Sequence, residues 1–472
     1  MKNQRKKAAE KRRTPKMAKL KDGIEMAKSA KKRSRAVSEP WAIAEIQVAG
    51  FKSISDEQKI EIRPLTILAG ANSSGKSSIM QPLLLLKQTL EASYDPGPLL
   101  LNGPNAKFTS AEQLLSRIGK GRSLDGFQVG MLLNTGEGFL TSFRKEHKMG
   151  FGIEQMENFG ASGQFSLRPE MTQAEIAEAG IAKKINIPEA APEENKPGEW
   201  RILRERCFLV PVWMSQRHDR TSSVLTGRPG PSWEVIIPHV IHLPGLRGNP
   251  ERTYPVTAVG PTYPGTFEKY TASVISRWKD EHEATLAALN ADLKLLKLTG
   301  GISAVAVNAV QIELQVGRLP DVPPTRLEDR VNIADVGVGV SQTLPVLVAL
   351  HAAKPGQLVY VEQPETHLHP RAQFALAQIL ASAAKRGVRV VVETHSSILL
   401  LGVQTLVAEG KLEPDKIKLH WFQREKDGRT VVRTGELDEA GAFGDWPEDF
   451  DDVALQTQAQ YLDAASARRL HK

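Results

Sequence analysis

The architecture of this chain follows from the octapeptide Gly70-Ala71-Asn72-Ser73-Ser74-Gly75-Lys76-Ser77, which fits the pattern G-x-x-x-x-G-K-[ST]. Residues 65–69 before it form a short apolar run of strand character, and residues 78–86 after it can form a buried helix. A Gly/Ser-rich loop without any chemistry would not need this context. We therefore predict a loop that binds the phosphates of a nucleotide.

Each position of the loop has a predicted role. Gly70 and Gly75 let the backbone turn closely enough for its N–H groups to face phosphate oxygens, and the helix start adds its positive dipole end. Lys76 would reach the β- and γ-phosphates, and the Ser77 hydroxyl would sit on Mg²⁺. The predicted cofactors are therefore ATP and Mg²⁺. The predicted nucleotide contacts in this segment are Gly70, Asn72, Ser73, Ser74, Gly75, Lys76, Ser77 and Ser78.

Length and composition narrow the class of protein. With 472 residues, 41% of them hydrophobic, the chain can bury a large core. Its single cysteine, Cys207, excludes an internal disulfide, and we expect a buried structural thiol. The sequence has no apolar run near the roughly 18 residues of a membrane-spanning helix and no signal-peptide pattern. We therefore expect a soluble cytoplasmic protein without a membrane partner.

The basic charge is concentrated in the first 36 residues. These hold 15 Lys and Arg against 3 Asp and Glu, a formal charge of +12, whereas the whole chain carries +8. Residues 1–38 contain almost no large apolar side chain, so we expect a disordered tail. Two interpretations of this tail stay open: a solvated extension, or an arm that holds nucleic-acid phosphates without reading sequence.

The rest of the sequence predicts an α/β protein. Residues 273–298 predict one helix with a leucine stripe that faces a core, and residues 303–316 predict a hairpin. The predicted organisation comprises the tail (1–38), the first part of a nucleotide-binding head (39–100), a β-rich inserted lobe (101–245), a short helical and hairpin insertion (246–330) and the second part of the head (331–472).

Two apolar strands in the second part of the head end in polar residues. Residues 357–361 lead into Glu362, and residues 388–392 lead into Glu393-Thr394-His395. Continuous β-branched runs of this kind predict a parallel sheet with helices on both faces. A phosphate-loop ATPase holds Mg²⁺ between the loop hydroxyl and an acid at a neighbouring strand end. We therefore predict Ser77 and Glu362 as the metal ligands.

The residue after Glu362 departs from the expected chemistry. A second acid is expected there as the base for the attacking water, but Gln363 can orient water and cannot accept its proton at neutral pH. Glu365 is the nearest remaining carboxylate. Three alternatives stay open: slow hydrolysis, Glu365 as the base, or the substrate phosphate as the proton acceptor.

Three histidines lie near these strand ends. We predict that His395 senses the γ-phosphate, because an imidazole can hydrogen-bond a phosphate oxygen or the attacking water. His367 and His369 could form a zinc pair with Glu362 or Glu365, since imidazole and carboxylate suit this metal. We favour a conformational role for both beside the nucleotide.

Four segments in this order carry a resemblance to a known family: Gly70–Ser77, Gly337–Gln342, Glu362–Pro370 and Thr394–Ser396. They resemble the ABC-type ATPase heads of the RecF, SMC and OLD group. They are most similar to stand-alone bacterial AAA-family ATPases with the motif E-Q-P-E-x-H-L-H-P. The resemblance covers about 41–100 and 240–450, including 445–450, and it implies a P-loop NTPase head of ABC type.

The resemblance also implies a homodimer. Two heads would close face to face on two ATP molecules, so that Ser341 of one chain touches the γ-phosphate held by Lys76 of the other. Glycines before an apolar helix agree with a second anion site made of backbone N–H groups. The implied contacts from this segment are Gly339, Ser341 and Gln342. The wider group usually has Asp-Glu or Glu-Glu where this chain has Glu362-Gln363.

The function implied by the resemblance is an ATP-gated dimeric switch on DNA or on an effector, in bacterial anti-phage defence. A RecF-like DNA-repair ATPase and an ATP-dependent scaffold with little hydrolysis remain as alternatives. The acids between 445 and 452 crowd into one loop, so we expect a separate nuclease or toxin partner rather than a nuclease within the chain. Transport is not expected, because the sequence has no membrane span.

Overall fold

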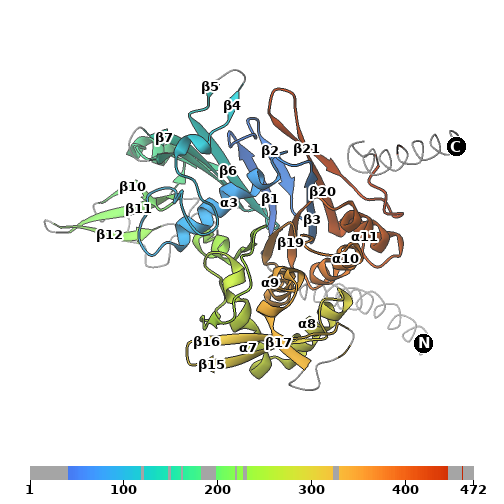
Figure 1. Ribbon diagram of the computed structural model, residues 1–472. Coiled ribbons are helices and arrows are strands. Elements are labelled where there is room, and N and C mark those ends of the chain that lie inside the picture. The colour runs from blue at the N-terminus through green and yellow to red at the C-terminus, as the bar shows by residue number, and fades with distance from the viewer. Residues whose placement is uncertain are drawn as a thin grey trace, which may run out of the picture. The chain divides into compact units, whose positions relative to one another are not determined.

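The computed structural model of the chain describes residues 41–118, 122–146, 150–160, 163–181, 198–217, 220–226, 231–320, 322, 329–444 and 460 (Figure 1). The predicted tail (1–38), the late segment 445–450 and its neighbouring acids lie outside these residues. Every element below lies in the second of the two units of the chain, Ala42–Lys472. In the part of the chain that is described, no helix has the length and apolar character to cross a membrane.

The centre of the second unit is a six-stranded sheet. Its strands in spatial order are β13 (Ile241–Leu243), β18 (Leu358–Glu362), β19 (Arg389–Thr394), β3 (Leu65–Gly70), β20 (Ile417–Arg424) and β21 (Thr430–Gly435). Neighbours are parallel from β13 to β20, and only β21 is antiparallel. All six residues of β3 are buried, as expected for a strand covered on both faces.

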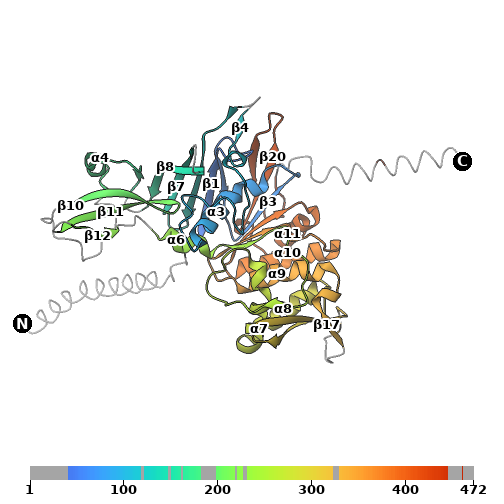
Figure 2. The ribbon, with the colours of Figure 1, turned by 60° about the vertical axis from the view of Figure 1, so that its left-hand side comes forward.

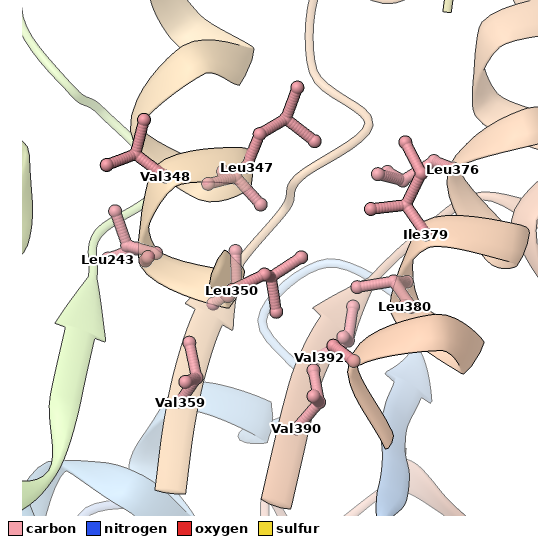
Figure 3. Packing of buried hydrophobic residues seen from close by; sticks show 14 of the residues in the cluster. Leu243, Leu347, Val348, Leu350, Val359, Leu376, Ile379, Leu380, Val390 and Val392 are labelled. Carbon is pink, nitrogen blue, oxygen red and sulfur yellow. The ribbon is translucent and has the colours of Figure 1, made fainter. Parts of the chain in front are cut away.

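Side chains of β3 alternate between two hydrophobic cores. Leu65, Ile67 and Ala69 face a core that also contains the helices α9 (Val338–Ala352), α10 (Pro370–Lys385) and α11 (Ser397–Ala408). Figure 3 shows side chains of this core from α9, α10 and three strands: Leu243, Leu347, Val348, Leu350, Val359, Leu376, Ile379, Leu380, Val390 and Val392. Leu68 faces the other core, which contains α3 (Lys76–Glu91).

A second, antiparallel sheet lines the other core. Its strands in spatial order are β2 (Gln58–Glu61), β1 (Ile43–Ala49), β6 (Gly126–Leu133), β7 (Gly138–Glu146), β8 (Gly150–Phe159) and β9 (Phe165–Leu167). Alternate side chains of β6 are buried, and Phe127 stacks on Phe143 of β7. Strands from the range predicted as an inserted lobe therefore share one sheet with β1 and β2. The two sheets enclose α3 between them, and the α/β class predicted for this chain is confirmed.

Smaller elements complete this region. They are β4 (Arg117–Ile118), β5 (Arg122–Ser123), α4 (Gln173–Glu178), β10 (Gly198–Glu205), β11 (Phe208–Arg217), β12 (Arg220–Thr226) and α6 (Trp233–Ile236). The strands β10, β11 and β12 form a separate antiparallel sheet (Figure 2). Cys207 lies in the turn between β10 and β11 and is fully buried, which raises the pKa of its thiol. The expectation of a buried structural thiol is confirmed.

The range 246–330 contains a helical pair and a small sheet. Its elements are β14 (Tyr254–Pro255), α7 (Thr271–Glu281), α8 (Glu283–Leu295), β15 (Ile302–Asn308), β16 (Gln311–Gly317) and, just beyond it, β17 (Arg330–Asn332). The hairpin is confirmed as β15 and β16. The prediction of one helix over 273–298 is wrong, because the chain leaves helical geometry at His282 (φ −142°, ψ 56°). Both helices pack against α9, so tertiary packing overrides the continuous helical pattern.

Candidate nucleotide-binding site

Close approach by neighbouring strands fixes the two glycines of the phosphate loop. Gly70 and Gly75 have φ of 143° and 103°, which favour glycine. A Cβ on Gly70 would lie 2.3 Å from the Phe422 carbonyl oxygen, and one on Gly75 would lie 2.4 Å from Thr430 Oγ1. The hydroxyl of Thr430 also donates to the Ser74 carbonyl at 2.7 Å. The loop is therefore held by β20 and β21 at the carboxyl end of β3.

The start of α3 is prepared for an anion. Its N-cap is Gly75, no side chain caps it, and its first turn contains no acid. The first N–H groups of a helix have no partner within the helix, and the helix dipole favours negative charge there. Lys76 Nζ donates to the carbonyls of Gly70 at 3.0 Å and Ala71 at 2.8 Å. Burial lowers the Lys76 pKa, although the charges of Glu393 and Glu365 oppose this shift.

The acid beside Ser77 is Glu393, at the end of β19. Ser77 Oγ donates to Glu393 Oε1 at 3.0 Å, and the buried Tyr360 hydroxyl donates to Glu393 Oε2 at 2.9 Å. Burial and the charge of Glu362 raise the pKa of Glu393, against the opposing effects of Ser77, Tyr360 and Lys76. Both oxygens of this carboxylate are therefore fixed under the loop. The sequence contains one indication that Glu393 belongs to the site: like Glu362, it directly follows an apolar strand segment.

Glu362 makes different contacts from those that we predicted from its position. His242 Nε2 lies 3.2 Å from Glu362 Oε1, and the Gly245 N–H donates to Glu362 Oε2 at 3.1 Å. Burial acts to raise the Glu362 pKa, but His242, the Gly245 N–H and the charge of Arg247 together lower it. Glu362 is thus an ionised carboxylate held by the segment that follows β13. The structure brings Ser77 to Glu393 rather than to Glu362.

Gln363 lies on the wall of the cleft in a strained backbone conformation. Its φ is 44°, a region that residues other than glycine seldom adopt, and its N–H donates to the Glu393 carbonyl at 2.7 Å. Backbone strain of this kind tends to occur at functional sites. An amide side chain can hydrogen-bond a water molecule, and the role of Gln363 in orienting the attacking water stays a prediction.

Glu365 positions the end of β19. Its Oε1 accepts hydrogen bonds from the Thr394 hydroxyl at 2.7 Å and from the His395 N–H at 2.9 Å. Its Oε2 is buried and has no hydrogen-bond partner among the described residues. Glu365 does not line the cleft, whereas His395 does. The contacts therefore favour Glu365 as a residue that orients His395.

His395 has the electrostatic character of a neutral imidazole. Burial and the charge of Lys76 lower its pKa, and a backbone hydrogen bond with Gly70 opposes them. A neutral ring can donate from one nitrogen and accept at the other, which suits contact with a phosphate oxygen or a water. The other two histidines, His367 and His369, are exposed, and no group of three metal-binding side chains occurs among the described residues.

The cleft at this end of β3 has a volume of about 730 Å³. It brings together most of the predicted nucleotide contacts with the two predicted residues at the reacting end: Asn72, Ser73, Gly75, Lys76, Ser77, Ser78, Gln363 and His395. Gly70 and Ser74 belong to the loop but do not line the cleft. Lys52, Glu393 and Arg424 are among the further residues that line the cleft. Lys52 lies between β1 and β2 and Arg424 ends β20, so local sequence gave no signal for them.

The start of α9 lies outside this cleft. Ser341 is half-buried and its hydroxyl donates to the Val338 carbonyl at 3.0 Å, while Gly339 and Ser341 line separate hollows. Gln342 is buried, and its side-chain amide donates to the Gly248 carbonyl. Within one chain, the structure therefore does not bring Gly339, Ser341 and Gln342 to the phosphate loop.

A buried arginine connects the start of α9 to the end of β18. Arg247 NH1 donates to the Gln342 carbonyl at 3.2 Å, and NH2 donates to the carbonyls of Glu362 and Gln363. Burial lowers the Arg247 pKa to about 10, against the charges of Glu362, Glu365 and Glu268, so the guanidinium stays charged at neutral pH. The start of α9 and the end of β18, both predicted to face a nucleotide, are thus joined through the Arg247 side chain.

The donor set fits Mg²⁺ bound together with a nucleotide. Ser77 and Glu393 offer hard oxygen atoms, and the described residues contain no cluster of acids and histidines that could bind a metal ion alone. Mg²⁺ is typically held by one or two carboxylates plus substrate phosphates and water. Ser77 and Glu393 are the residues that would hold it on the phosphates, and the ion would neutralise phosphate charge there.

Two family models match the chain. Residues 42–129, which include the phosphate loop, match the AAA ATPase domain family. Residues 320–401, which include α9, Glu362 and His395, match the family described as AAA domain, putative AbiEii toxin, Type IV TA system. Both parts of the predicted head are therefore similar to AAA domains, a similarity that implies nucleotide binding. No curated protein matches the chain.

Several solved structures of SMC heads align with most of the chain. An Smc head domain with an extended coiled coil, bound to the C-terminal domain of ScpA and derived from Pyrococcus furiosus, is 13% identical with a TM-score of 0.44, covering 85% of this chain and 98% of its own. The SMC head domain from Thermotoga maritima is 10% identical with a TM-score of 0.34, covering 83% and 98%. A Pyrococcus yayanosii Smc head domain with a coiled coil and joint is 10% identical with a TM-score of 0.44, covering 85% and 98%.

Proposed function

We propose that this chain is a Mg²⁺-dependent ATPase of ABC type that works as an ATP-gated dimeric switch. The observation that carries the proposal is the cleft at the end of β3. There the uncapped start of α3, Lys76 and the Ser77–Glu393 pair meet Gln363 and His395. This combination can bind a triphosphate and hold a water molecule at its reacting end.

The side chains of the cleft divide into two groups. Lys76, the N–H groups of α3 and the additional cations Lys52 and Arg424 supply positive charge for the phosphates. Gln363 and the neutral His395 can orient the attacking water, but neither matches a carboxylate as its proton acceptor. We therefore expect slow turnover, with proton transfer to the substrate phosphate or to a carboxylate nearby.

Pairing of two chains would complete the site. Gly339 and Ser341 lie at the start of an apolar helix, with the Ser341 hydroxyl outside the cleft of their own chain. Backbone N–H groups at such a position can bind an anion. In a symmetric dimer the same two surfaces meet twice, so each α9 would cover the nucleotide of the other chain. This arrangement makes assembly depend on ATP.

The biological role that we propose is bacterial anti-phage defence in the cytoplasm, with a separate nuclease or toxin as the effector. Support comes from the description of the matched family, which names a putative toxin of a toxin–antitoxin system. The basic tail provides a second candidate partner, because its formal charge of +12 can bind nucleic-acid phosphates. A RecF-like repair role would use that contact, and a scaffold role would use ATP binding with little hydrolysis.

Steady-state phosphate release tests the proposal. We expect the wild type to turn over slowly and Gln363→Glu to turn over at least about tenfold faster, because a positioned base contributes about 10²–10⁴-fold. Glu365→Gln is the comparison. If it stops turnover without changing the affinity for ATP, Glu365 or the His395 that it holds carries the proton step. A wild type that binds ATP but remains silent would favour the scaffold, and absent ATP binding would contradict the proposal.

The proposed tail contact has its own test. Deleting residues 1–36 should weaken binding to duplex DNA and flatten its salt dependence, since fewer counterions are released. The measurement is DNA affinity at a series of salt concentrations, with the undeleted chain as control. An unchanged slope would place any DNA contact on the body, which carries a formal charge of −4 outside the first 36 residues.

A further inference from the structure

The carboxylate nearest the phosphate-loop hydroxyl comes from an unexpected strand. Ser77 Oγ lies 3.0 Å from Glu393 Oε1, and Tyr360 fixes Glu393 Oε2 from the opposite side at 2.9 Å. Tyr360 is fully buried, and Glu393 is 5% exposed and lines the cleft. This carboxylate thus has a single supported orientation, with one oxygen directed at the hydroxyl that would contact Mg²⁺.

Strand order places Glu393 closer to the loop than Glu362. The strand β19 lies between β3 and β18, and Glu393 pairs in register with Leu68 of β3 on one side and Glu362 of β18 on the other. Neighbouring strands are about 4.8 Å apart, so β18 lies roughly 10 Å from β3. Glu393 reaches Ser77 across one strand spacing, whereas Glu362 would have to cross two.

Glu362 makes its hydrogen bonds to the segment that follows β13 and not to the phosphate loop. One of its oxygens lies 3.2 Å from His242 Nε2, and the other accepts the Gly245 N–H at 3.1 Å. The next residue is the neutral Gln363. The end of β18 therefore offers the cleft an amide, and the buried acid of the cleft comes from β19.

We infer that Glu393 is the carboxylate that, together with Ser77, positions Mg²⁺ on the nucleotide, and that Tyr360 holds it in place. The inference rests on the proposed nucleotide function and assigns the acid that the end of β18 does not bring to Ser77. Glu393 acts on the ion or its bound water, and Glu362 supports the segment around Gly245. Removing the carboxylate should therefore change how Mg²⁺ affects nucleotide binding more than the binding itself.

The test compares ATP affinity in excess Mg²⁺ with ATP affinity in EDTA, by calorimetry on the full chain. We expect Glu393→Gln to bind ATP in EDTA within about threefold of the wild type, because Lys76 and the loop are intact. The gain in affinity from Mg²⁺ should fall by about 10–100-fold, the range seen when partners of a metal site are removed. Tyr360→Phe, which removes one hydrogen bond, should lower the gain less.

A second measurement detects the ion without turnover. Free aqueous Mn²⁺ gives a sharp electron paramagnetic resonance signal that weakens on binding, so a titration in the presence of ADP measures the bound fraction, which Glu393→Gln should lose. Glu112→Gln is the matched control, because Glu112 also lines the cleft but pairs with the exposed Lys145. We expect it to retain bound Mn²⁺. Thermal unfolding of each variant, with Glu393→Asp as a shorter carboxylate, verifies the fold.

The possible failures are distinguishable. If Glu393→Gln keeps the full Mg²⁺ gain while Glu362→Gln loses it, the inference is overturned and Glu362 holds the ion. If both variants keep the gain, no role of Glu393 in metal binding survives. A wild type that binds no ATP with or without Mg²⁺ would remove the proposed function itself.

Discussion

Two helices of this molecule, α3 and α9, have glycine as the N-cap residue and no side-chain capping hydrogen bond, but their surroundings differ. At α3, Lys76 is 4% exposed and makes two hydrogen bonds, and Ser77 meets a buried acid. At α9, Val338 is 44% exposed and Ser341 bonds only within its own first turn in the described structure. The side chains around the start of α3 all come from the same chain. The start of α9 lies outside the cleft of its own chain, which agrees with the proposed contact to a second molecule.

Removing the cation at α3 should have the largest effect. Lys76→Ala deletes a buried ammonium that can make two charge-assisted hydrogen bonds to phosphates, each worth about 1.5–3 kcal/mol. We expect ATP affinity to fall by about 10²–10⁴-fold, measured by calorimetry. The exposed Lys385→Ala is the control and should bind normally. An unchanged affinity in Lys76→Ala would refute the phosphate-loop assignment.

A substitution that blocks the start of α9 should impair assembly and leave nucleotide binding at α3 intact. Ser341→Arg places a long cation on the half-buried first turn of α9, where it would clash with a facing chain. We expect ATP affinity within about threefold of wild type and ATP-dependent dimerisation weakened more than about tenfold, measured by analytical ultracentrifugation. Gln378→Arg adds the same charge to an exposed position on α10 and should assemble normally. Normal assembly of Ser341→Arg would show that α9 does not face a partner.

The smallest effect is expected at Arg247, which joins the two regions. Arg247→Lys keeps the charge but cannot reach the carbonyls of Gln342 and Glu362 together. Losing one such hydrogen bond costs about 1–2 kcal/mol, so we expect dimerisation to weaken by about fivefold to thirtyfold with ATP affinity nearly unchanged. Arg252→Lys is the control, because its ion pair with Asp335 is exposed and contributes little. Equal assembly of both variants would show that Arg247 only supports the fold.

The local parts of the fold could be predicted from the sequence. The phosphate loop, its strand and its helix follow from glycine positions and an apolar pattern, and the parallel strands follow from continuous β-branched runs. The break at His282 could not be predicted, because no glycine or proline marks it. It results from packing against α9, which depends on residues more than fifty positions away.

The same limit applies to the site. Lys76, Ser77, Gln363 and His395 were predicted because each lies in a recognisable motif, and the structure places all four on one cleft. The partner of Ser77 was predicted as Glu362, whereas the structure shows Glu393 there. Deciding between two acids at the ends of apolar strands requires the order of those strands in the sheet. That order places β19 beside β3, and a single sequence does not state it.

The buried Cys207 has a practical consequence for studying assembly. It is the only cysteine of the chain, and burial both shields it from reagents and disfavours its reactive thiolate. A single cysteine introduced at the exposed Val338, in the first turn of α9, would therefore react almost alone with a bifunctional maleimide. The native cysteine therefore need not be removed before cross-linking, and a cross-link between two introduced cysteines would show that two chains have assembled.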